Sequence, residues 1–382
     1  MVYLDYSATT PVDKEVLNTF NKACEGFIGN PNSLHKLGHD AKKLIDDATK
    51  QIADILGVKE REIIYTSGAS ESNNTAVKGI CLKHQNRGKH IITTKLEHSS
   101  VIAPTSYLQS LGFDVDFVKI NDDGLVDLDN LKELIREDTI LVSIASVNSE
   151  VGVSQPINEI GKILRNYPKI FFHSDITQSI GKEVVDLSNV DLASFSAQKF
   201  YGIKGIGCLI KKEGINIEPL IHGGKSTTIY RSGTPATPLI ASMSKALRLA
   251  YDNFSDRVNH VCELNDHLRE ELEKLDKIHI NSTKNSVPHI VNFSVMNIKP
   301  ETMQHALEEE EIYISTQTAC SSGVGDGISQ AVYAITKSSD YAAHSLRVSI
   351  SHLTTKEEID KFVEVLSKKL TELGELYGNN KD

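Results

Sequence analysis

The chain has 382 residues, and because hydrophobic cores stop growing near ~250 to 300 residues, two domains are expected. Its 41 Lys and Arg residues against 51 Asp and Glu give a formal net charge of −10 without any run rich in Lys and Arg, which argues against a nucleic-acid backbone or an anionic membrane as the main partner. A content of 40% hydrophobic and 24% charged residues is typical of a soluble globular protein, and no stretch approaches the ~18 apolar residues of a membrane span. A small-molecule or protein partner is therefore favoured.

The N-terminus and the cysteines predict a cytoplasmic protein. Residues 1–5 lack the basic segment and apolar run of a secretory signal. The five cysteines are an odd number, and the closest pair, Cys208 and Cys262, is 54 residues apart, so no Cys-x-x-Cys metal or redox motif exists. His35 and His39 have helical spacing but no third ligand nearby, so we expect no metal site and no disulfide.

Apolar periodicity predicts an α/β fold for most of the chain. Residues 33–56 keep the three-and-four spacing of one helical face, and Gly57 follows as a C-cap. Residues 62–66 predict a buried strand, 67–70 a tight turn and Glu71 onward a helix. Further apolar runs, mostly separated by helical segments, predict a mainly parallel sheet covered on both faces: residues 90–94, 115–120, 140–145, 170–173 and 192–196. A strand at 205–210 follows too soon for a helical crossover and is expected to be antiparallel.

The last third of the chain predicts a smaller α+β domain. A long helical stretch at 239–275 precedes the remaining elements, which are strands at 290–295 and 346–350 and helices at 301–310 and 356–373. We expect a large domain at residues 12–255 and a small domain formed by residues 1–11 and 256–382. Residues 317–339 are rich in Ser and Gly, contain Cys320 and predict one long irregular segment, and such loops in compact domains are usually functional.

Three strand ends carry polar residues that could perform chemistry. Lys199 ends an apolar strand, where desolvation can lower the pKa of an amine enough for Schiff-base formation, although an ordinary strand-end lysine is the alternative. Asp175 ends another and needs a cationic partner such as a protonated pyridine nitrogen, unless it is a helix N-cap. The turn at residues 67–70 opens a helix whose free N–H groups favour an anion such as phosphate. Together these features suggest pyridoxal 5′-phosphate.

Ten short motifs are distributed along the chain. They are Tyr3-Leu4-Asp5-Tyr6-Ser7-Ala8-Thr9-Thr10-Pro11, Gly29-Asn30-Pro31-Asn32-Ser33, Thr66-Ser67-Gly68-Ala69-Ser70-Glu71, Glu97-His98, Val147-Asn148-Ser149-Glu150-Val151-Gly152, Asp175-Ile176-Thr177-Gln178, Lys199-Phe200-Tyr201-Gly202, Arg231-Ser232-Gly233-Thr234, Thr318-Ala319-Cys320-Ser321 and Leu346-Arg347. In this order the motifs resemble the cysteine desulfurases of the NifS/IscS type, pyridoxal-phosphate enzymes of the class-V aminotransferase family. The resemblance implies a homodimer with the aspartate-aminotransferase-like fold, fold type I, in which a large domain with a mainly parallel seven-stranded sheet carries a smaller α+β domain.

The resemblance also implies roles at the cofactor ring. Lys199 is expected to attach the cofactor and to move protons to and from the substrate. Asp175 is expected to keep the pyridine nitrogen protonated, and Gln178 to hydrogen-bond the ring hydroxyl. His98 is expected to stack on the ring and to assist proton transfer.

Further roles concern the phosphate and the substrate. Four residues of one chain are expected to hold the phosphate: Ala69, Ser70, Ser196 and Gln198. Thr234 is expected to reach the same phosphate from the other subunit. Asn148 and Arg347 are similar to the residues that bind the substrate carboxylate, a task that suits the bidentate guanidinium.

Cys320 matches the family nucleophile. Its thiolate is expected to attack the sulfur of L-cysteine, leaving a persulfide on Cys320 and releasing L-alanine. The other four cysteines fall in helical or strand patterns and are expected to be buried packing residues: Cys24, Cys81, Cys208 and Cys262.

Three positions depart from the family pattern. Gln198 stands where the family usually has a histidine, so a neutral donor faces the phosphate. Ile176 replaces a small alanine, and we expect it beside the ring face. Residues 225–229 replace a Gly-rich segment that usually contains a glutamate.

The sequence therefore predicts a cysteine desulfurase that donates sulfur to an acceptor protein. Two other hypotheses remain: another aminotransferase or lyase reaction on the same scaffold, and a diverged interaction protein that binds the cofactor weakly. The acceptor could belong to iron–sulfur, thiamine or tRNA-thiolation pathways. The C-terminus resembles that of family members without the long tail used for iron–sulfur scaffold docking, which favours a tRNA-thiolating partner.

Overall fold

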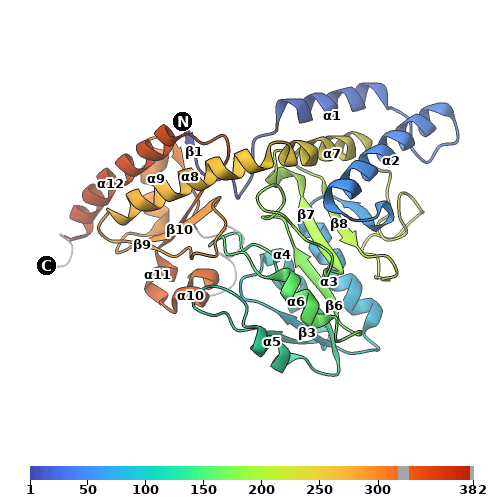
Figure 1. Ribbon diagram of the computed structural model, residues 1–382, viewed down its shortest axis with the longest axis horizontal. Coiled ribbons are helices and arrows are strands. Elements are labelled where there is room, and N and C mark those ends of the chain that lie inside the picture. The colour runs from blue at the N-terminus through green and yellow to red at the C-terminus, as the bar shows by residue number, and fades with distance from the viewer. Residues whose placement is uncertain (317–326, 379–382) are drawn as a thin grey trace.

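The computed structural model describes residues 1–316 and 327–378 of the chain (Figure 1). Its central element is a seven-stranded sheet with the strand order β2-β8-β7-β6-β5-β3-β4. The strands are β2 (Ile63–Thr66), β3 (His90–Thr93), β4 (Asp114–Phe117), β5 (Thr139–Ser143), β6 (Phe171–Asp175), β7 (Leu192–Ser196) and β8 (Gly207–Lys211). Pairing is parallel from β4 to β7, whereas β8 runs antiparallel to both β7 and β2. The predicted seven-stranded, mainly parallel sheet is confirmed, as is the antiparallel strand.

Helices cover both faces of this sheet, as the strand composition requires. Every residue of β5, β7 and β8 is buried, which is the pattern of strands that are covered on two sides. Consecutive residues alternate between two hydrophobic clusters: Tyr65 and Ile92 pack in one, whereas Ile64 and Ile91 pack in the other. The covering helices are α1 (Lys14–Gly26), α2 (Lys36–Leu56), α3 (Ala69–His84), α4 (Ser99–Ser110), α5 (Leu128–Leu134), α6 (Ile157–Leu164) and α7 (Thr237–Tyr251).

The predicted end of α2 is confirmed. Gly57 caps the helix in the left-handed conformation, with φ 63° and ψ 34°. This conformation is unfavourable for residues with a Cβ atom, and glycine adopts it without that cost. At the other end, the His35 side chain accepts a hydrogen bond from the Gly38 amide, so the helix begins three residues later than the apolar pattern suggests.

A second group of elements surrounds a three-stranded antiparallel sheet with the order β12-β10-β9. A parallel pair, β1 (Val2–Tyr3) with β11 (Ile312–Tyr313), brings the N-terminus to this group, and Val2 and Leu4 are buried in its hydrophobic core (Figure 1). The remaining elements are α8 (Phe254–Glu273), β9 (Ile278–Ile280), β10 (Ile290–Val295), α9 (Pro300–Glu308), α10 (Gln330–Thr336), α11 (Ser339–Ala343), β12 (Ser345–Ser349) and α12 (Lys356–Gly378).

Two predictions for this region are wrong in part. The helical stretch expected at 239–275 is divided into α7 and α8 at Asp252 and Asn253, and Asn253 has a left-handed φ of 57°. Asparagine tolerates that conformation better than most residues, so apolar periodicity alone does not reveal the break. The segment expected to be irregular at 317–339 contains α10, whose apolar residues pack against Leu96 and Val153. Figure 1 shows α7 and α8 following one another across the molecule.

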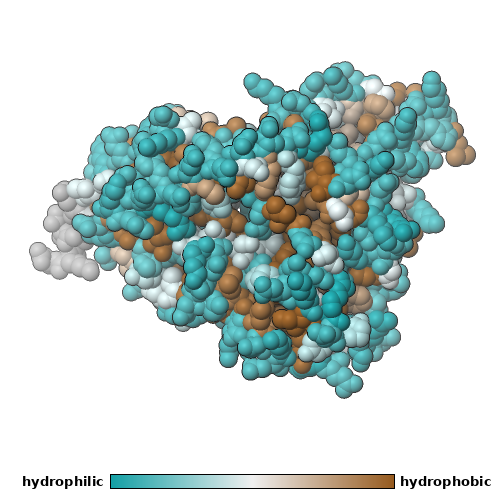
Figure 2. Space-filling view, viewed as in Figure 1, coloured by the Kyte–Doolittle hydropathy of each residue, from teal (hydrophilic) through white to brown (hydrophobic). Residues whose placement is uncertain are grey.

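Among the described residues, no helix is long and apolar enough to cross a membrane. Figure 2 shows hydrophilic residues over most of the visible face, with apolar residues at the tip where α1 is joined to α2. Two side chains of that connection are strongly exposed, Ile28 at 75% and Leu34 at 90%. An apolar tip of this kind is typical of a surface that contacts another protein.

Candidate active site

A cavity of about 590 Å³ lies where the parallel strands end and collects most of the predicted site residues. Cavities at the carboxyl ends of parallel strands are the usual ligand sites of open α/β sheets. Nine predicted residues line it: Ala69, Ser70, His98, Asp175, Gln178, Ser196, Gln198, Lys199 and Arg347. Residues so distant in sequence are brought together because β2, β3, β6 and β7 all end on this side.

Lys199 lies at the end of the short helix that follows β7 (Ala197–Lys199). Its Nζ donates hydrogen bonds to the backbone oxygens of Ser7, at 2.6 Å, and Ala8, at 2.7 Å. The same N-terminal segment also contacts Gln198, the residue before Lys199, because the Thr10 amide donates to the Gln198 backbone oxygen at 3.0 Å. Backbone carbonyls near the N-terminus therefore hold the Lys199 amine in the cavity.

Asp175, the last residue of β6, is a buried carboxylate with neutral partners. Its Oδ1 accepts from the Thr177 amide at 2.9 Å, and its Oδ2 accepts from Asn73 Nδ2 at 2.7 Å. A buried carboxylate is stable when a cation also faces it. A protonated pyridine nitrogen in the cavity would meet that requirement, so the residue fits the cofactor that the sequence predicts.

Asn73 connects Asp175 to His98 through Ser100. Its Nδ2 also donates to Ser100 Oγ at 2.9 Å, and Ser100 Oγ lies 2.7 Å from His98 Nδ1. Because the Ser100 amide also donates to Nδ1, at 3.1 Å, the neutral imidazole carries its proton on Nε2. Burial lowers the pKa of His98, an effect that Asp175 partly offsets, so the neutral form dominates at neutral pH.

Gln178 is held by two groups. Its Nε2 donates to the Ser7 oxygen at 3.0 Å, and its Oε1 accepts from Lys182 Nζ at 2.5 Å. Because the Ser7 carbonyl can only accept, the amide is fixed with its nitrogen toward Ser7 and its oxygen toward Lys182. Burial, together with the charges of Lys199 and Arg347, lowers the pKa of Lys182 to about 7.

The phosphate end is built on the turn between β2 and α3. Gly68 has φ 154°, and a Cβ atom there would lie 3.5 Å from Ser196 Oγ, so this hydroxyl lies beside the turn. Glu71 fixes the turn, because its carboxylate accepts from the Ser67 amide at 2.8 Å and from Arg231 Nε at 3.0 Å. The open N-terminus of α3, Ser70, Ser196 and Gln198 form a set of neutral donors that fits a phosphate group.

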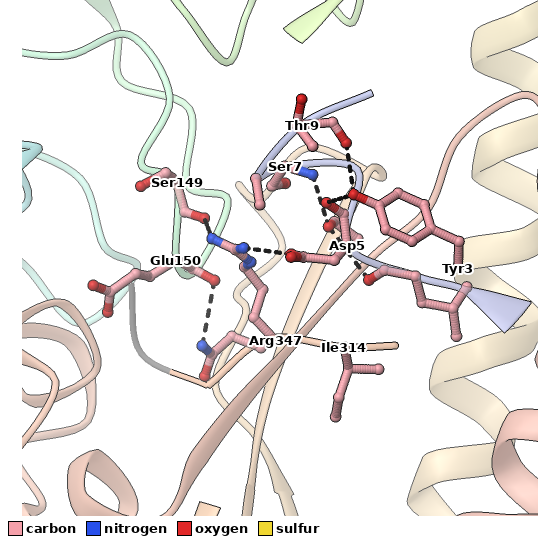
Figure 3. A network of polar contacts seen from close by, with 12 residues as sticks. Tyr3, Asp5, Ser7, Thr9, Ser149, Glu150, Ile314 and Arg347 are labelled. Atoms are coloured by element: carbon pink, nitrogen blue, oxygen red, sulfur yellow. Dashed lines mark hydrogen bonds and ion pairs between the residues drawn. The ribbon is translucent and has the colours of Figure 1, made fainter. Parts of the chain in front are cut away.

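Arg347 lies in β12 at the other end of the cavity, and its side chain is only 3% exposed. Figure 3 shows its guanidinium between Asp5 and Ser149. One Nη donates to the Ser149 oxygen at 2.9 Å and the other to Asp5 Oδ1 at 2.6 Å. The Nε atom is buried without a hydrogen-bond partner among the described residues, so the guanidinium can still bind a carboxylate.

Two predicted site residues do not line the cavity, and a third lies outside the described residues. Asn148 is buried, and its side chain bonds to the backbone of Leu96, Glu150 and Val151, which leaves one Nδ2 hydrogen for a ligand. Thr234 is exposed on the surface. Cys320 lies outside the described residues. The roles predicted for these three residues stay predictions.

Three expectations about single residues are wrong. Ile176 does not face the ring site, since its side chain is fully buried in the core, whereas its neighbours Asp175 and Thr177 line the cavity. Cys24 is exposed and Cys262 is only half-buried, although both are expected to be buried. Cys81 and Cys208 are buried as expected, and burial raises the pKa of both thiols well above the usual range.

Several residues that build the site escaped the sequence analysis: Asn73, Lys182 and the Glu71–Arg231 ion pair. Only Asn73 has a local signal, because it follows Ala69 by one helical turn and must face the same side. The Glu71–Arg231 ion pair depends on packing between distant segments, whereas Lys182 contacts Gln178 only four residues away, within an irregular turn.

Comparison with known proteins supports the resemblance. The family model for "Aminotransferase class-V" matches residues 2–362. A protein of Dictyoglomus turgidum named "Cysteine desulfurase IscS" is 39% identical over 97% of this chain and 95% of its own length. A protein of the same name from Glaesserella parasuis is 41% identical over 98% of this chain and 94% of its own.

Solved structures agree with these relatives. One described as "NIFS-LIKE PROTEIN" superposes with a TM-score of 0.91 at 35% identity and covers 97% of this chain and 99% of its own. Another, "SspA in complex with cysteine", has a TM-score of 0.81 at 31% identity and covers 93% of this chain and 100% of its own.

The buried Lys182 leads to a prediction about pH. In the folded protein this amine loses its proton near pH 7, whereas the exposed amine of the unfolded chain keeps it until about 10.5, so the unfolded state binds more protons between these values. The free energy of unfolding of the wild type should therefore rise relative to that of Lys182→Met as the pH increases across this interval. Urea unfolding of both proteins at the two ends of this pH interval measures the difference in the free energy of unfolding. Lys95→Met, at an exposed lysine, should show no such trend, and equal trends in both variants would contradict the prediction.

Proposed function

This chain belongs to the class-V aminotransferase family, and from that premise we propose how its cavity performs the reaction of a pyridoxal-phosphate-dependent cysteine desulfurase. The enzyme converts L-cysteine to L-alanine and passes the sulfur to an acceptor, which is supported by relatives named "Cysteine desulfurase IscS" that are about 40% identical over nearly the whole chain. The single observation that carries the residue roles is the cavity itself, in which nine residues chosen from sequence lie together.

When bound, pyridoxal phosphate supplies an electron-withdrawing ring that weakens the C–S bond of the substrate. Lys199 attaches the cofactor and then serves as a base, with the Ser7 and Ala8 carbonyls as resting partners of its amine. Asp175 would keep the ring nitrogen protonated, and Gln178 would donate to the ring hydroxyl from the amide nitrogen that the Ser7 carbonyl orients. Ala69, Ser70, Ser196 and Gln198 hold the phosphate.

His98 is proposed to stack on the ring and to donate the proton carried by Nε2. The contacts of Nδ1 with Ser100 keep this tautomer, and the lowered pKa keeps the ring neutral. Arg347 binds the substrate carboxylate through the Nε edge that has no partner among the described residues. Asn148 assists with its remaining Nδ2 hydrogen.

Cys320 is proposed as the nucleophile. Its thiol loses a proton, and the thiolate attacks the substrate sulfur. An S–S bond forms while the C–S bond breaks, and the electron pair of the broken bond stays with the carbon. That carbon then takes up a proton, and L-alanine leaves. The balance is one cysteine and one thiol converted to one alanine and one persulfide, which the acceptor protein then consumes.

We further propose a homodimer in the cytoplasm, with the large domain at 12–255 and the small domain at 1–11 and 256–382. The exposed Ile28 and Leu34 would be covered by the second copy, and exposed Thr234 is free to reach the partner's phosphate site. A reducing compartment suits an enzyme that needs a free thiol. A tRNA-thiolating enzyme is the favoured sulfur acceptor, ahead of an iron–sulfur scaffold or a thiamine-pathway protein.

One prediction of the proposed function tests the cofactor lysine. The purified protein should be yellow, with absorbance near ~420 nm. Lys199→Ala should lose this band and retain at most loosely bound cofactor, because the amine that attaches the cofactor is gone. Lys204→Ala, at an exposed lysine in the next loop, should keep the spectrum of the wild type. A normal band that borohydride still reduces in Lys199→Ala would assign the attachment to another lysine.

The second prediction tests the nucleophile. Cys320→Ala should still bind L-cysteine, seen as a change in the visible spectrum, but should yield almost no alanine and no protein-bound persulfide. Cys24→Ala is the matched control, since this thiol is exposed and should be dispensable. Alanine and sulfide are assayed together, and the persulfide by mass spectrometry. Alanine and sulfide at the rate of the wild type from Cys320→Ala would move the nucleophile elsewhere, and a keto product would indicate another reaction.

A further inference from the structure

Asp5 shares the arginine that is proposed to bind the substrate carboxylate. We propose that Asp5 is an affinity-setting residue: its fixed carboxylate competes with the carboxylates of L-cysteine and L-alanine for Arg347, so both amino acids bind more weakly and the product leaves faster. The inference rests on the proposed function, which assigns Arg347 to the carboxylate.

The contact is close and largely shielded from water. Asp5 Oδ1 lies 2.6 Å from Arg347 Nη2, and the side chains are 20% and 3% exposed (Figure 3). Ser149 accepts from the other Nη, whereas Nε has no partner among the described residues, so the edge that Nε forms with the second N–H of an adjacent Nη can bind a ligand. An incoming carboxylate on that edge lies on the same guanidinium as Asp5. At such separations and with little solvent, two carboxylates repel each other appreciably.

Asp5 is unable to move away easily when a ligand arrives. The Tyr3 hydroxyl donates to the backbone oxygens of Asp5, at 3.1 Å, and Thr9, at 2.8 Å, which closes the segment on itself. Asp5 also forms a bridge to Ser349, whose amide donates to the Leu4 oxygen at 2.7 Å. Because Ser349 and Arg347 belong to the same strand, Asp5 and the guanidinium are fixed to one element and stay together.

The charge of Asp5 acts on the substrate and the product alike. L-cysteine and L-alanine carry the same carboxylate, so Asp5 weakens both by a similar factor, and this uniform effect changes binding rather than the chemical step. A product that keeps the main recognition group of its substrate inhibits the enzyme, and a resident carboxylate limits that inhibition. Arg347 without a counter-ion would also be a buried unpaired charge in the empty site, which Asp5 avoids.

The test compares two ligands on the holoenzyme. L-alanine and L-alaninamide differ only in the carboxylate, and the change in the cofactor's visible absorbance gives the Kd of each. Asp5→Asn keeps the shape and an acceptor oxygen for Nη2 but removes the charge. It should lower the Kd of L-alanine on the order of tenfold and leave that of L-alaninamide unchanged. Asp13→Asn, at the half-buried N-cap of α1, is the matched control and should change neither.

The outcomes separate this inference from the proposed function. If the wild type binds L-alanine no better than L-alaninamide, Arg347 is not the carboxylate residue and the proposed assignment fails. If the wild type discriminates but Asp5→Asn leaves the Kd of L-alanine unchanged or raises it, only the inference about Asp5 is wrong. Asp5→Ala, which also removes the charge, should shift the Kd in the same direction and serves if Asp5→Asn does not fold.

Discussion

The cavity depends on one short peptide, the N-terminal segment at residues 5–10. Its carbonyls hold the amine of Lys199 and the amide of Gln178, its Asp5 carboxylate holds Arg347, and Thr10 bonds to the backbone of Gln198. The segment is itself fixed, because β1 before it pairs with β11 and Val2 and Leu4 are buried in the core around the three-stranded sheet. A site at the end of one sheet is therefore completed by residues anchored beside another. A disturbance of the first ten residues should be felt at the lysine and at the arginine together.

Burial makes the charges around this peptide interdependent. Lys182 has no carboxylate within an ion-pair distance among the described residues and bonds instead to a neutral amide, so burial and neighbouring cations lower its pKa to about 7. The Glu97 carboxyl, next to His98, is buried as well, and its pKa rises to about 8, chiefly through burial. Both groups can therefore be uncharged near neutral pH. Arg347 and Asp5 form the charged pair at the proposed binding site of the substrate carboxylate. Because Asp5 balances its charge, the guanidinium can be buried there.

The sequence sufficed for the features that depend on local pattern. Short buried strands, the Gly57 cap and the residues at strand ends follow from periodicity and turn chemistry, and parallel strands necessarily bring their carboxyl ends to one side. The break at Asn253 and the helix α10 were missed because a polar residue in a left-handed turn leaves the apolar periodicity intact and a Ser/Gly-rich stretch masks a short helix. The direction of Ile176 was wrong, since the side chains of adjacent residues at the end of a strand point to opposite sides. The contacts of Lys182 and Asp5 join residues four and 342 positions apart, and nothing in the local pattern determines which groups meet.

The distribution of charge along the cavity also explains how the substitution at Gln198 is accommodated. At the phosphate end, the nearby cation Arg231 is already paired with Glu71, so a phosphate there would be bound by the N–H groups of α3, by serine hydroxyls and by the neutral Gln198 amide. The charged side chains of the cavity, Lys199, Asp175 and Arg347, lie away from the phosphate end, where they are proposed to contact the ring and the substrate carboxylate. A neutral donor at position 198 therefore reduces attraction for the phosphate without altering the charges of Lys199, Asp175 or Arg347. With the proposed roles, cofactor retention and chemistry are governed by different groups, and the departure from the family pattern at Gln198 falls on retention alone.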